Sequence, residues 1–214
     1  SMASLDIGLG PLMLLVALAL AFDFMNGFHD AANSIATVVS TRVLKPHQAV
    51  LWAAVFNVIA IFVFQLKVAT TIGKGTIDPA IVDQYVIFGA LIGAIAWNVI
   101  TWYYGIPSSS SHALIGGLVG AALASGGFDS LIWTGVGKTV LFIFVAPLLG
   151  FVLGGAIMVA VAWICHRVPA GKADNVFRRL QLLSAAMYSL GHGGNDAQKT
   201  IGIIWMLLIA ANVS

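Results

Sequence analysis

Long apolar segments constrain the fold of this chain more than any other feature of its sequence. They lie near residues 9–39, 48–66, 85–104, 112–127, 136–165 and 181–212, and polar residues interrupt the first and the last. A helix needs about 20 apolar residues to cross a hydrocarbon layer of roughly 30 Å, in which its backbone polar groups must bond to each other. The sequence therefore predicts an all-α integral membrane protein, a polytopic helical bundle. The short segment 112–127 is either a full span or part of a re-entrant hairpin.

The composition agrees with a membrane location. Of the 214 residues, 60% are hydrophobic and 8% are charged, and the mean hydropathy is +0.99, whereas a soluble domain carries about 25% charged residues. The net charge of +2 and the placement of basic residues in short loops argue against a nucleic-acid partner. We expect a multi-pass protein of the cell membrane, either an inner or a plasma membrane, with the lipid bilayer as its surroundings.

The Lys and Arg residues of the short loops predict the orientation, because cytoplasmic loops of membrane proteins carry an excess of them. Arg42 and Lys45 lie in one loop, and the stretch 167–179 carries four Lys and Arg residues, whereas the loop 67–83 balances two Lys with two Asp. Six crossings that start from an outside N-terminus place both basic loops on the cytoplasmic side. This count treats 112–127 as a span.

A polar motif occurs twice, 166 residues apart. The stretch NGFHDAANSIA (26–36) aligns with HGGNDAQKTIG (192–202), which pairs Asp30 with Asp196, and each copy interrupts an apolar segment. By the crossing count the two copies run in opposite directions, so the repeats are inverted. Inverted repeats built around broken helices, with polar residues at the bilayer midplane, are typical of secondary transporters.

The repeat also predicts the domain organisation. We assign residues 1–180 to a first transporter repeat with its cytoplasmic loop, and 181–214 to the start of a second, inverted repeat. The polar stretch GIPSSSSH (105–112) has no counterpart 166 residues later in this sequence. We therefore expect the chain to be truncated within the second repeat.

Asp30 and Asp196 are the most informative single residues. A charged side chain at the bilayer centre costs at least about 2.5–3.5 kcal/mol, so such residues face an interior cavity and indicate a transport pathway. A structural alternative is an Asp that caps a half-helix. Asn33 falls on the same helical face as Asp30, and Asn195 precedes Asp196. We expect the two carboxylates to meet in a central site.

The stretch GIPSSSSH predicts a helix end followed by a helix start. Pro107 ends one helix, and the serines at 108–111 cap the next, whose free N–H groups and positive dipole end suit an anion. The alternative is a serine-rich cap with no ligand. His112 donates a hydrogen bond, carries a proton, or only satisfies a carbonyl group.

An anion site beside carboxylates suggests a protonated oxyanion. A carboxylate accepts hydrogen bonds but does not donate them, so it tolerates hydrogen phosphate and repels sulfate. It also binds Na⁺ or takes up H⁺, and either cation offsets the charge of an entering phosphate. Symport of phosphate with a cation is therefore physically sensible.

At these residues the chain resembles the inorganic phosphate transporter (PiT) family of sodium- or proton-coupled phosphate symporters. The motifs that carry the resemblance are GFHDAAN, GGNDAQKTIG and PSSSSH, in that order, and the resemblance covers essentially the whole chain. It implies phosphate import by alternating access, with a phosphate site near mid-membrane that both repeats form. It implies a transporter and no enzyme, with no catalytic residue and no cofactor beyond Na⁺ or H⁺ as coupling ion.

The resemblance also implies roles for individual residues. The expected phosphate-binding residues are Asp30, Asn33, Ser109, Ser110, Ser111, Asn195, Asp196 and Thr200, and those expected to bind the coupling cation are Asp30, Asn33 and Asp196. A bound metal other than Na⁺ is not expected in the protein itself. The substrate is inorganic phosphate, either free or as a metal–phosphate complex, and a homodimer is one option for the oligomeric state.

The sequence departs from the family pattern in both repeated motifs. His29 stands where many members have Asn, and Gln198 and Lys199 replace the Ala-Asn of the second motif. Lys199 adds a positive charge where a sodium ion would otherwise sit, which leaves proton or metal–phosphate coupling open. The alternative is that the Lys199 side chain extends to the membrane surface or pairs with an Asp.

Two other classes of function fit parts of the sequence. An intramembrane enzyme would use His29 with Asp30, His112 and His192 as metal ligands, or a serine of the SSSSH run as a nucleophile. A passive anion channel would carry phosphate without an ion gradient. A channel gives no reason for two buried carboxylates.

Overall fold

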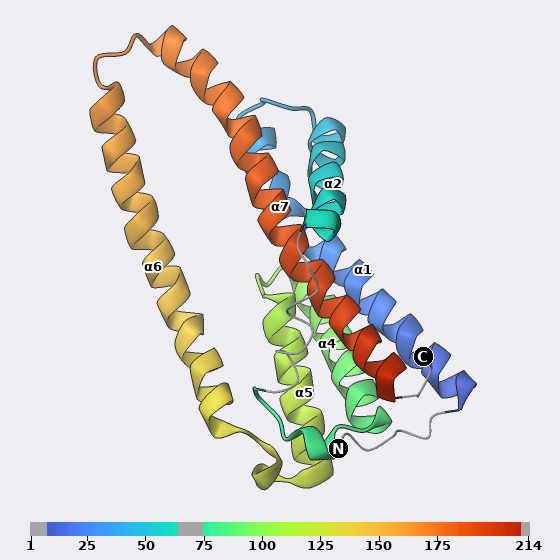
Figure 1. Cartoon of the computed structure of the whole chain (residues 1–214). Coiled ribbons are helices and arrows are strands. Elements are labelled where there is room, and N and C mark those ends of the chain that lie inside the picture. The colour runs from blue at the N-terminus through green and yellow to red at the C-terminus, as the bar shows by residue number, and fades with distance from the viewer. Residues whose placement is uncertain (1–7, 64–74, 211–214) are drawn as a thin grey trace.

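The computed structural model describes residues 8–63 and 75–210 of the chain. Its α-helices are α1 (Leu9–Ser40), α2 (Pro46–Val63), α4 (Gln84–Tyr104), α5 (Ser110–Gly126), α6 (Trp133–Cys165) and α7 (Ala170–Ala210), with short 3₁₀ turns at Pro79–Ile81 and Phe128–Ser130. Apart from one isolated bridge between Ile77 and Leu131, the described residues contain no β structure. The predicted all-α fold is confirmed (Figure 1).

Helices α1 and α7 are continuous, so the predicted interruptions at the two motifs were wrong. Each helix runs through its polar motif without a break, over 32 residues in α1 and 41 in α7. The physical reason is that neighbouring helices provide partners for the polar side chains of the motifs. The backbone hydrogen bonds of the helices therefore remain intact. The proposed boundary at residues 180 and 181 falls inside α7.

Helices α1 and α7 lie side by side in opposite directions. Thr41 contacts Gln181 (Oγ1 to Oε1, 2.9 Å), and Asp30 lies 3.7 Å from His192. Further along, Thr200 donates to Asp23 at 2.7 Å. Rising numbers on α1 therefore meet falling numbers on α7, as Figure 1 shows. The two motif copies run antiparallel, which is the arrangement that the crossing count predicts.

Helices α4 and α5 form a re-entrant hairpin. The residues before α4 and after α5 are joined, because Asp78 N–H donates to Ser130 O (2.9 Å) and Ile132 N–H to Thr76 O (3.0 Å). The turn between the helices lies beside Asp30, ten residues or about 15 Å of helix before α1 ends at Ser40. The hairpin therefore enters and leaves at one end of the bundle. Segment 112–127 is not a separate span.

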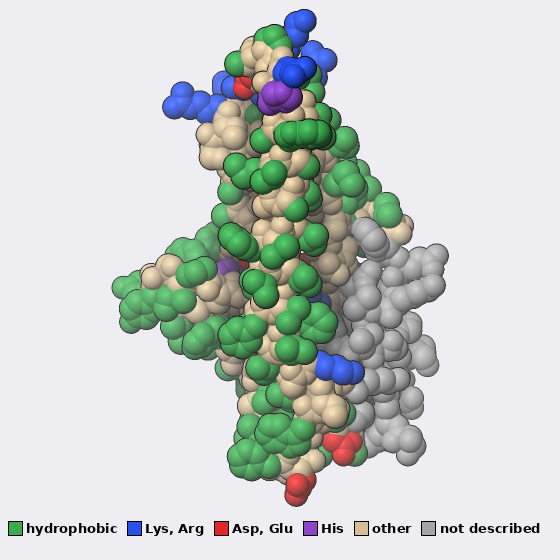
Figure 2. Space-filling view, turned by 90° about the vertical axis from the view of Figure 1, so that its left-hand side faces the viewer, with side chains coloured by type: hydrophobic (Ala, Val, Ile, Leu, Met, Phe, Trp, Pro, Cys, Tyr) green, Lys and Arg blue, Asp and Glu red, His purple; other side chains and the backbone are tan. Residues whose placement is uncertain are grey.

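The basic loops lie together at the other end of the molecule, which we call the basic end. The Arg178 guanidinium donates to the Arg42 carbonyl oxygen at 3.4 Å, so the α1–α2 connection and the start of α7 are neighbours. On the face in Figure 2, Lys and Arg side chains gather mainly at this end, with hydrophobic side chains along the length below. The prediction that both loops share one side still holds. A hairpin that enters and leaves at one end removes two crossings, so the direction of the helices after it is unchanged.

Two apolar clusters pack the bundle, one on each side of a polar layer. The larger joins the first half of α1 to the hairpin and to the end of α7, and includes Phe22, Leu91, Leu114 and Leu207. The smaller cluster, at the basic end, joins Val38, Ala49 and Ala185. Because these clusters hold the helices above and below, the polar residues between them face one another.

Helix α6 stands apart from the rest of the bundle in Figure 1. None of its residues is buried, and it is the most apolar of the helices long enough to span a membrane, with a hydropathy of 2.6. Helices α1, α2 and α4 also qualify by length and composition. The chain is a multi-pass membrane protein.

Close packing inside the hairpin gives a first prediction. A Cβ atom on Gly117 would lie 3.2 Å from the Ala90 Cα and would collide with its carbonyl oxygen, whereas one on Gly116 would meet nothing within 4 Å. We expect Gly117→Ala to lower the free energy of unfolding by about 1–3 kcal/mol through overpacking. Gly116→Ala should be neutral or stabilise by up to about 1 kcal/mol. Thermal unfolding in detergent compares the two, and equal stability of both variants would contradict the packing.

The topology gives a second prediction. The chain has one cysteine, so single cysteines are introduced into a Cys165→Ala background at Arg42, at the basic end, and at exposed Asp129, beside the hairpin base. On intact cells a membrane-impermeant maleimide should label the Asp129→Cys variant, and the Arg42→Cys variant only after permeabilisation. Labelling of both in intact cells would show that the ends lie on one side.

Candidate functional site

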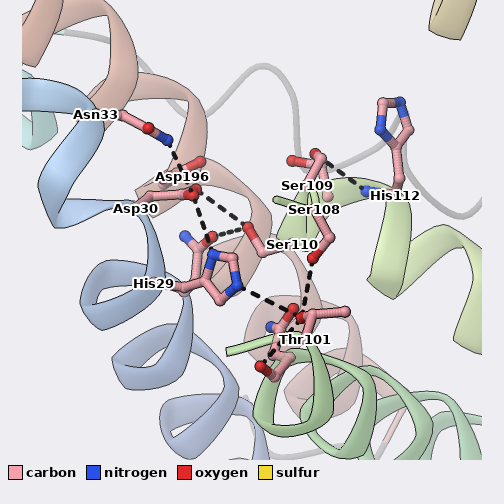
Figure 3. Close-up of polar contacts among 12 residues, drawn as sticks. His29, Asp30, Asn33, Thr101, Ser108, Ser109, Ser110, His112 and Asp196 are labelled. Carbon is pink, nitrogen blue, oxygen red and sulfur yellow. Dashed lines mark hydrogen bonds and ion pairs between the residues drawn. The ribbon is translucent and has the colours of Figure 1, made fainter. Parts of the chain in front are cut away.

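Three elements meet in the polar layer between the apolar clusters. They are the middle of α1 at residues 26–33, the second motif of α7 at residues 192–200, and the turn at residues 105–109 with the first residues of α5. Figure 3 shows how the side chains of α1 and of the turn point toward one another. Two opposed motifs and a hairpin tip therefore build one site.

The sequence of the hairpin tip explains its shape. Gly105 ends α4 with a positive φ of 65°, a conformation that glycine adopts without a steric penalty. Pro107 cannot continue the helix, and Ser109 caps α5 by accepting the His112 N–H at 3.5 Å. The predicted serine cap is thus confirmed. The N-terminus of α5, with the positive end of its helix dipole, lies at the site, because Ser109 and Ser111 line the cavity there.

Asp30 lies at the centre of the site. Asn33 donates to its Oδ1 at 3.4 Å, and Ser110 donates to its Oδ2 at 3.3 Å. His29 Nδ1 and His192 Nε2 each lie 3.7 Å from the carboxylate. Ser110 is buried and also bonds to Asn26. These contacts hold the Asp30 carboxylate in place from α1, α5 and α7.

Asp196 faces Asp30 from the opposite helix. His192 Nδ1 lies 3.1 Å from Asp196 Oδ2, and the Lys199 ammonium lies 2.7 Å from Oδ1. Lys199 also donates to the Ser111 hydroxyl. One ligand atom each from Asp30, His192 and Asp196 lies within 4.8 Å of the others. The two carboxylates meet, as the aligned motifs predict.

An open cavity of about 510 Å³ lies against these residues; we call it the serine cavity. Its lining residues are Asp30, Asn33, Pro107, Ser108, Ser109, Ser111, His192, Asn195, Asp196 and Lys199. It offers hydroxyl and ammonium donors together with carboxylate acceptors. Six of the eight residues predicted to bind phosphate line it, and Ser110 lies directly behind Asp30.

Two predicted site residues lie elsewhere. His112 is exposed and faces a separate groove between α4 and α5, and in Figure 3 its ring points away from Asp30. Thr200 is buried and donates its hydroxyl hydrogen to Asp23 rather than lining the serine cavity. The helical geometry explains both positions, because His112 and Thr200 project from other faces of α5 and α7.

His192 and Lys199 line the serine cavity, although neither was among the residues predicted to bind phosphate or the coupling cation. A spacing signal for them was available, because residues 192, 196 and 199 recur at intervals of four and three and so share one helical face. Asp23, Asn26 and Asp30 show the same spacing on α1. For Lys199, pairing with an Asp was one of the predicted roles, and it does pair with Asp196.

The Asp30–His192–Asp196 group has a donor set that suits a cation. Two carboxylate oxygens and an imidazole nitrogen are ligands that proteins use for divalent metals. A cation there would compete with the Lys199 ammonium and with a protonated His192 for the same carboxylates. His112 lies outside the group, so the histidines do not form the three-ligand site of the enzyme alternative.

Comparison with known proteins identifies the family. The sequence model of the phosphate transporter family matches residues 26–214, which contain all three elements of the site. The chain belongs to the phosphate transporter family. The predicted resemblance is confirmed at the level of the family.

Individual relatives agree with this family. The chain is 60% identical over 201 residues to a probable low-affinity inorganic phosphate transporter of Rhizobium meliloti (strain 1021), covering 94% of this chain and 60% of that protein. It is 49% identical over 211 residues to one of Bacillus subtilis (strain 168), covering 98% and 63%. The chain thus spans about 60% of the length of these relatives. Both are named as transporters.

A solved structure shares the fold. The sodium-dependent phosphate transporter superposes with a TM-score of 0.84 at 22% identity, covering 96% of this chain and 69% of that chain. The arrangement of α1, α7 and the hairpin is therefore a fold known from a solved membrane transporter.

The Asp196–Lys199 pair gives a third prediction. Its side chains are only 15% and 19% exposed, so we expect Asp196→Asn or Lys199→Met to destabilise the protein by about 1.5–3 kcal/mol. The double variant should lose less than the sum, because neither charge is left unpaired. Thermal unfolding of the four proteins measures the coupling energy.

The exposed pair Arg178–Asp174 serves as the matched control. Its side chains are 46% and 66% exposed, and the same cycle should give a coupling below about 1 kcal/mol. Additive effects at Asp196 and Lys199 would show that their contact does not stabilise the fold.

Proposed function

We propose that the protein is a cation-coupled importer of inorganic phosphate that works by alternating access. The observation that carries this proposal is the serine cavity, in which hydroxyl groups, a helix N-terminus and the Lys199 ammonium face the Asp30 and Asp196 carboxylates. Membership of the phosphate transporter family and the names of the relatives support phosphate as the substrate.

The cavity combines donors and acceptors in the way that hydrogen phosphate requires. Unprotonated phosphate oxygens accept from Ser109, Ser111, Lys199 and the first N–H groups of α5. The phosphate hydroxyl donates to a carboxylate such as Asp30, which has no proton to give in return. Sulfate has no such hydroxyl at neutral pH, so the same carboxylate repels it. Selectivity for phosphate follows from this pattern.

Lys199 makes this site different from one that relies only on bound cations. Its ammonium is tethered within reach of both Asp196 and Ser111, so the cavity contains a permanent positive charge before any ion enters. That charge offsets part of the repulsion between the carboxylates and an incoming anion. A mobile cation is needed only for the charge that remains.

The arrangement of the helices supports alternating access. The site lies between antiparallel copies of one motif, near the middle of α1, with a hairpin tip that approaches from one end only. Movement of the hairpin relative to the α1–α7 pair would open the cavity to one side and then the other. We assign residues 1–180 and 181–214 to the first repeat and the start of the second on the same basis.

A metal–phosphate complex is a second form of the substrate that the site favours. The Asp30–His192–Asp196 group presents three ligand atoms within 4.8 Å of one another at the wall of the serine cavity. A divalent cation carried in with the phosphate would bind between the two carboxylates, where the His192 imidazole contacts both. Uptake of a radioactive divalent metal together with phosphate distinguishes this form from free phosphate.

Uptake of labelled phosphate by the full-length protein in liposomes tests the proposal. We expect phosphate to accumulate when a sodium or proton gradient is imposed, and sulfate in tenfold excess to compete weakly. Asp30→Asn and Asp196→Asn should lower uptake by at least about tenfold, because each removes a carboxylate that the phosphate hydroxyl and the cation require.

Asp129→Asn is the matched control, since Asp129 is exposed and lies outside the site. It should transport at the wild-type rate. Wild-type uptake in either site variant would rule out this cavity as the phosphate site. Uptake that needs no gradient and never concentrates phosphate would favour the passive channel.

A further inference from the structure

Asp23 is an intramembrane carboxylate outside both repeated motifs. It lies on α1, two helical turns before Asp30 and on the same face, and is partly buried. The Thr200 hydroxyl of α7 donates to its Oδ1 at 2.7 Å. None of the roles proposed above for the phosphate site uses this side chain.

Asp23 differs in its partners from Asp30 and Asp196, the two carboxylates that line the serine cavity. Asp30 lies near His29 and His192, and Asp196 near His192 and Lys199. Among residues 8–63 and 75–210, Asp23 forms no ion pair, and its hydrogen-bond partner Thr200 is neutral. A carboxylate without a cationic partner is costly inside a membrane unless it takes up a proton or binds a cation.

A second cavity, of about 210 Å³, connects Asp23 to the central group. It lies between α1, α2 and α7, and its polar lining residues are Asp23, Asn26, Asp30, Ser34, Asn57, His192 and Asp196. Asp30, His192 and Asp196 also line the serine cavity, so they form a wall shared by the two spaces. The Asn57 Oδ1 is buried and has no hydrogen-bond partner among the described residues. Asp23 thus lies across this wall from the phosphate site.

We propose that Asp23, held by Thr200, carries the coupling proton of the transport cycle. This inference rests on the phosphate-import function proposed above and assigns its coupling site. The carboxylate takes up one proton from the side of higher proton concentration to become a neutral carboxylic acid. It releases the same proton to the other side after the phosphate has left.

The charges that face Asp23 explain how the two events are linked. Asp30 lies on its own helix, and α7 presents His192, Asp196 and Lys199. The residues that α2 contributes to this cavity carry no charge; they are Asn57, Val58 and Ile61. Phosphate that binds beyond the shared wall adds negative charge, which favours a neutral Asp23. By reciprocity a protonated Asp23 favours phosphate binding. A proton needs only the carboxylate and one neutral partner, which Thr200 provides.

The experiment compares two measurements on the full-length protein in liposomes: phosphate counterflow, which needs no driving ion, and concentrative uptake driven by an imposed pH gradient. The wild-type protein should show both. Asp23→Asn should keep counterflow within about twofold of wild type and lose the acceleration by the pH gradient. Asp23→Glu should restore it, because a carboxylic acid returns to the same place.

Thr200→Val should keep counterflow and shift the pH at which driven uptake is half-maximal, because the hydroxyl that stabilises the Asp23 carboxylate is gone. Asp129→Asn, an exposed acid outside both cavities, is the control and should behave as wild type.

Each other outcome overturns the inference in a recognisable way. Gradient-driven uptake by Asp23→Asn at the wild-type rate would show that the proton is carried elsewhere. Loss of counterflow in Asp23→Asn and in Asp23→Glu would make Asp23 part of the phosphate site or of the fold. Dependence of the wild type on a sodium gradient that Asp23→Asn abolishes would replace the proton by Na⁺. Absence of counterflow in the wild type would overturn phosphate transport itself, and this inference with it.

Discussion

The contact between charged side chains of two antiparallel helices is the interaction on which the rest of this structure depends. Asp30 of α1 and Asp196 of α7 lie on either side of His192, and Lys199 completes the group. None of these side chains is stable alone in a hydrocarbon layer, so each helix requires the other. Asp30, His192 and Asp196 line both cavities, so the same contacts serve binding and stability.

The hairpin makes this polar group into a site for an anion. Without the tip at residues 105–109, the α1–α7 pair would offer carboxylates and few donors. The tip adds serine hydroxyls and the N-terminus of α5, held by the cap at Ser109 and by the bond from Ser110 to Asp30. A re-entrant hairpin can bring irregular backbone to this depth because Pro107, Ser108 and Ser109 of the tip line a cavity.

Much of the fold was predictable because the membrane restricts the choices. Apolar length predicted the helices, Lys and Arg predicted which loops share an end, and the repeated Asp predicted that opposed helices meet. The prediction failed where local sequence cannot show the neighbour. Polar residues such as Asn26 and Asp30 led to the prediction of a helix break. Ser110, more than 75 residues away in the chain, instead forms hydrogen bonds with both, and α1 stays unbroken.

The sequence by itself determined the class of protein, the family, and the two aspartates at the centre, because these depend on composition and on residue types at fixed spacing. Only the tertiary structure decided that α4 and α5 form a hairpin, that Ser110 donates to Asp30, and that Thr200 donates to Asp23. Those outcomes depend on the distance and direction between side chains of different helices. Such distances arise only when apolar clusters above and below the polar layer hold the helices in register.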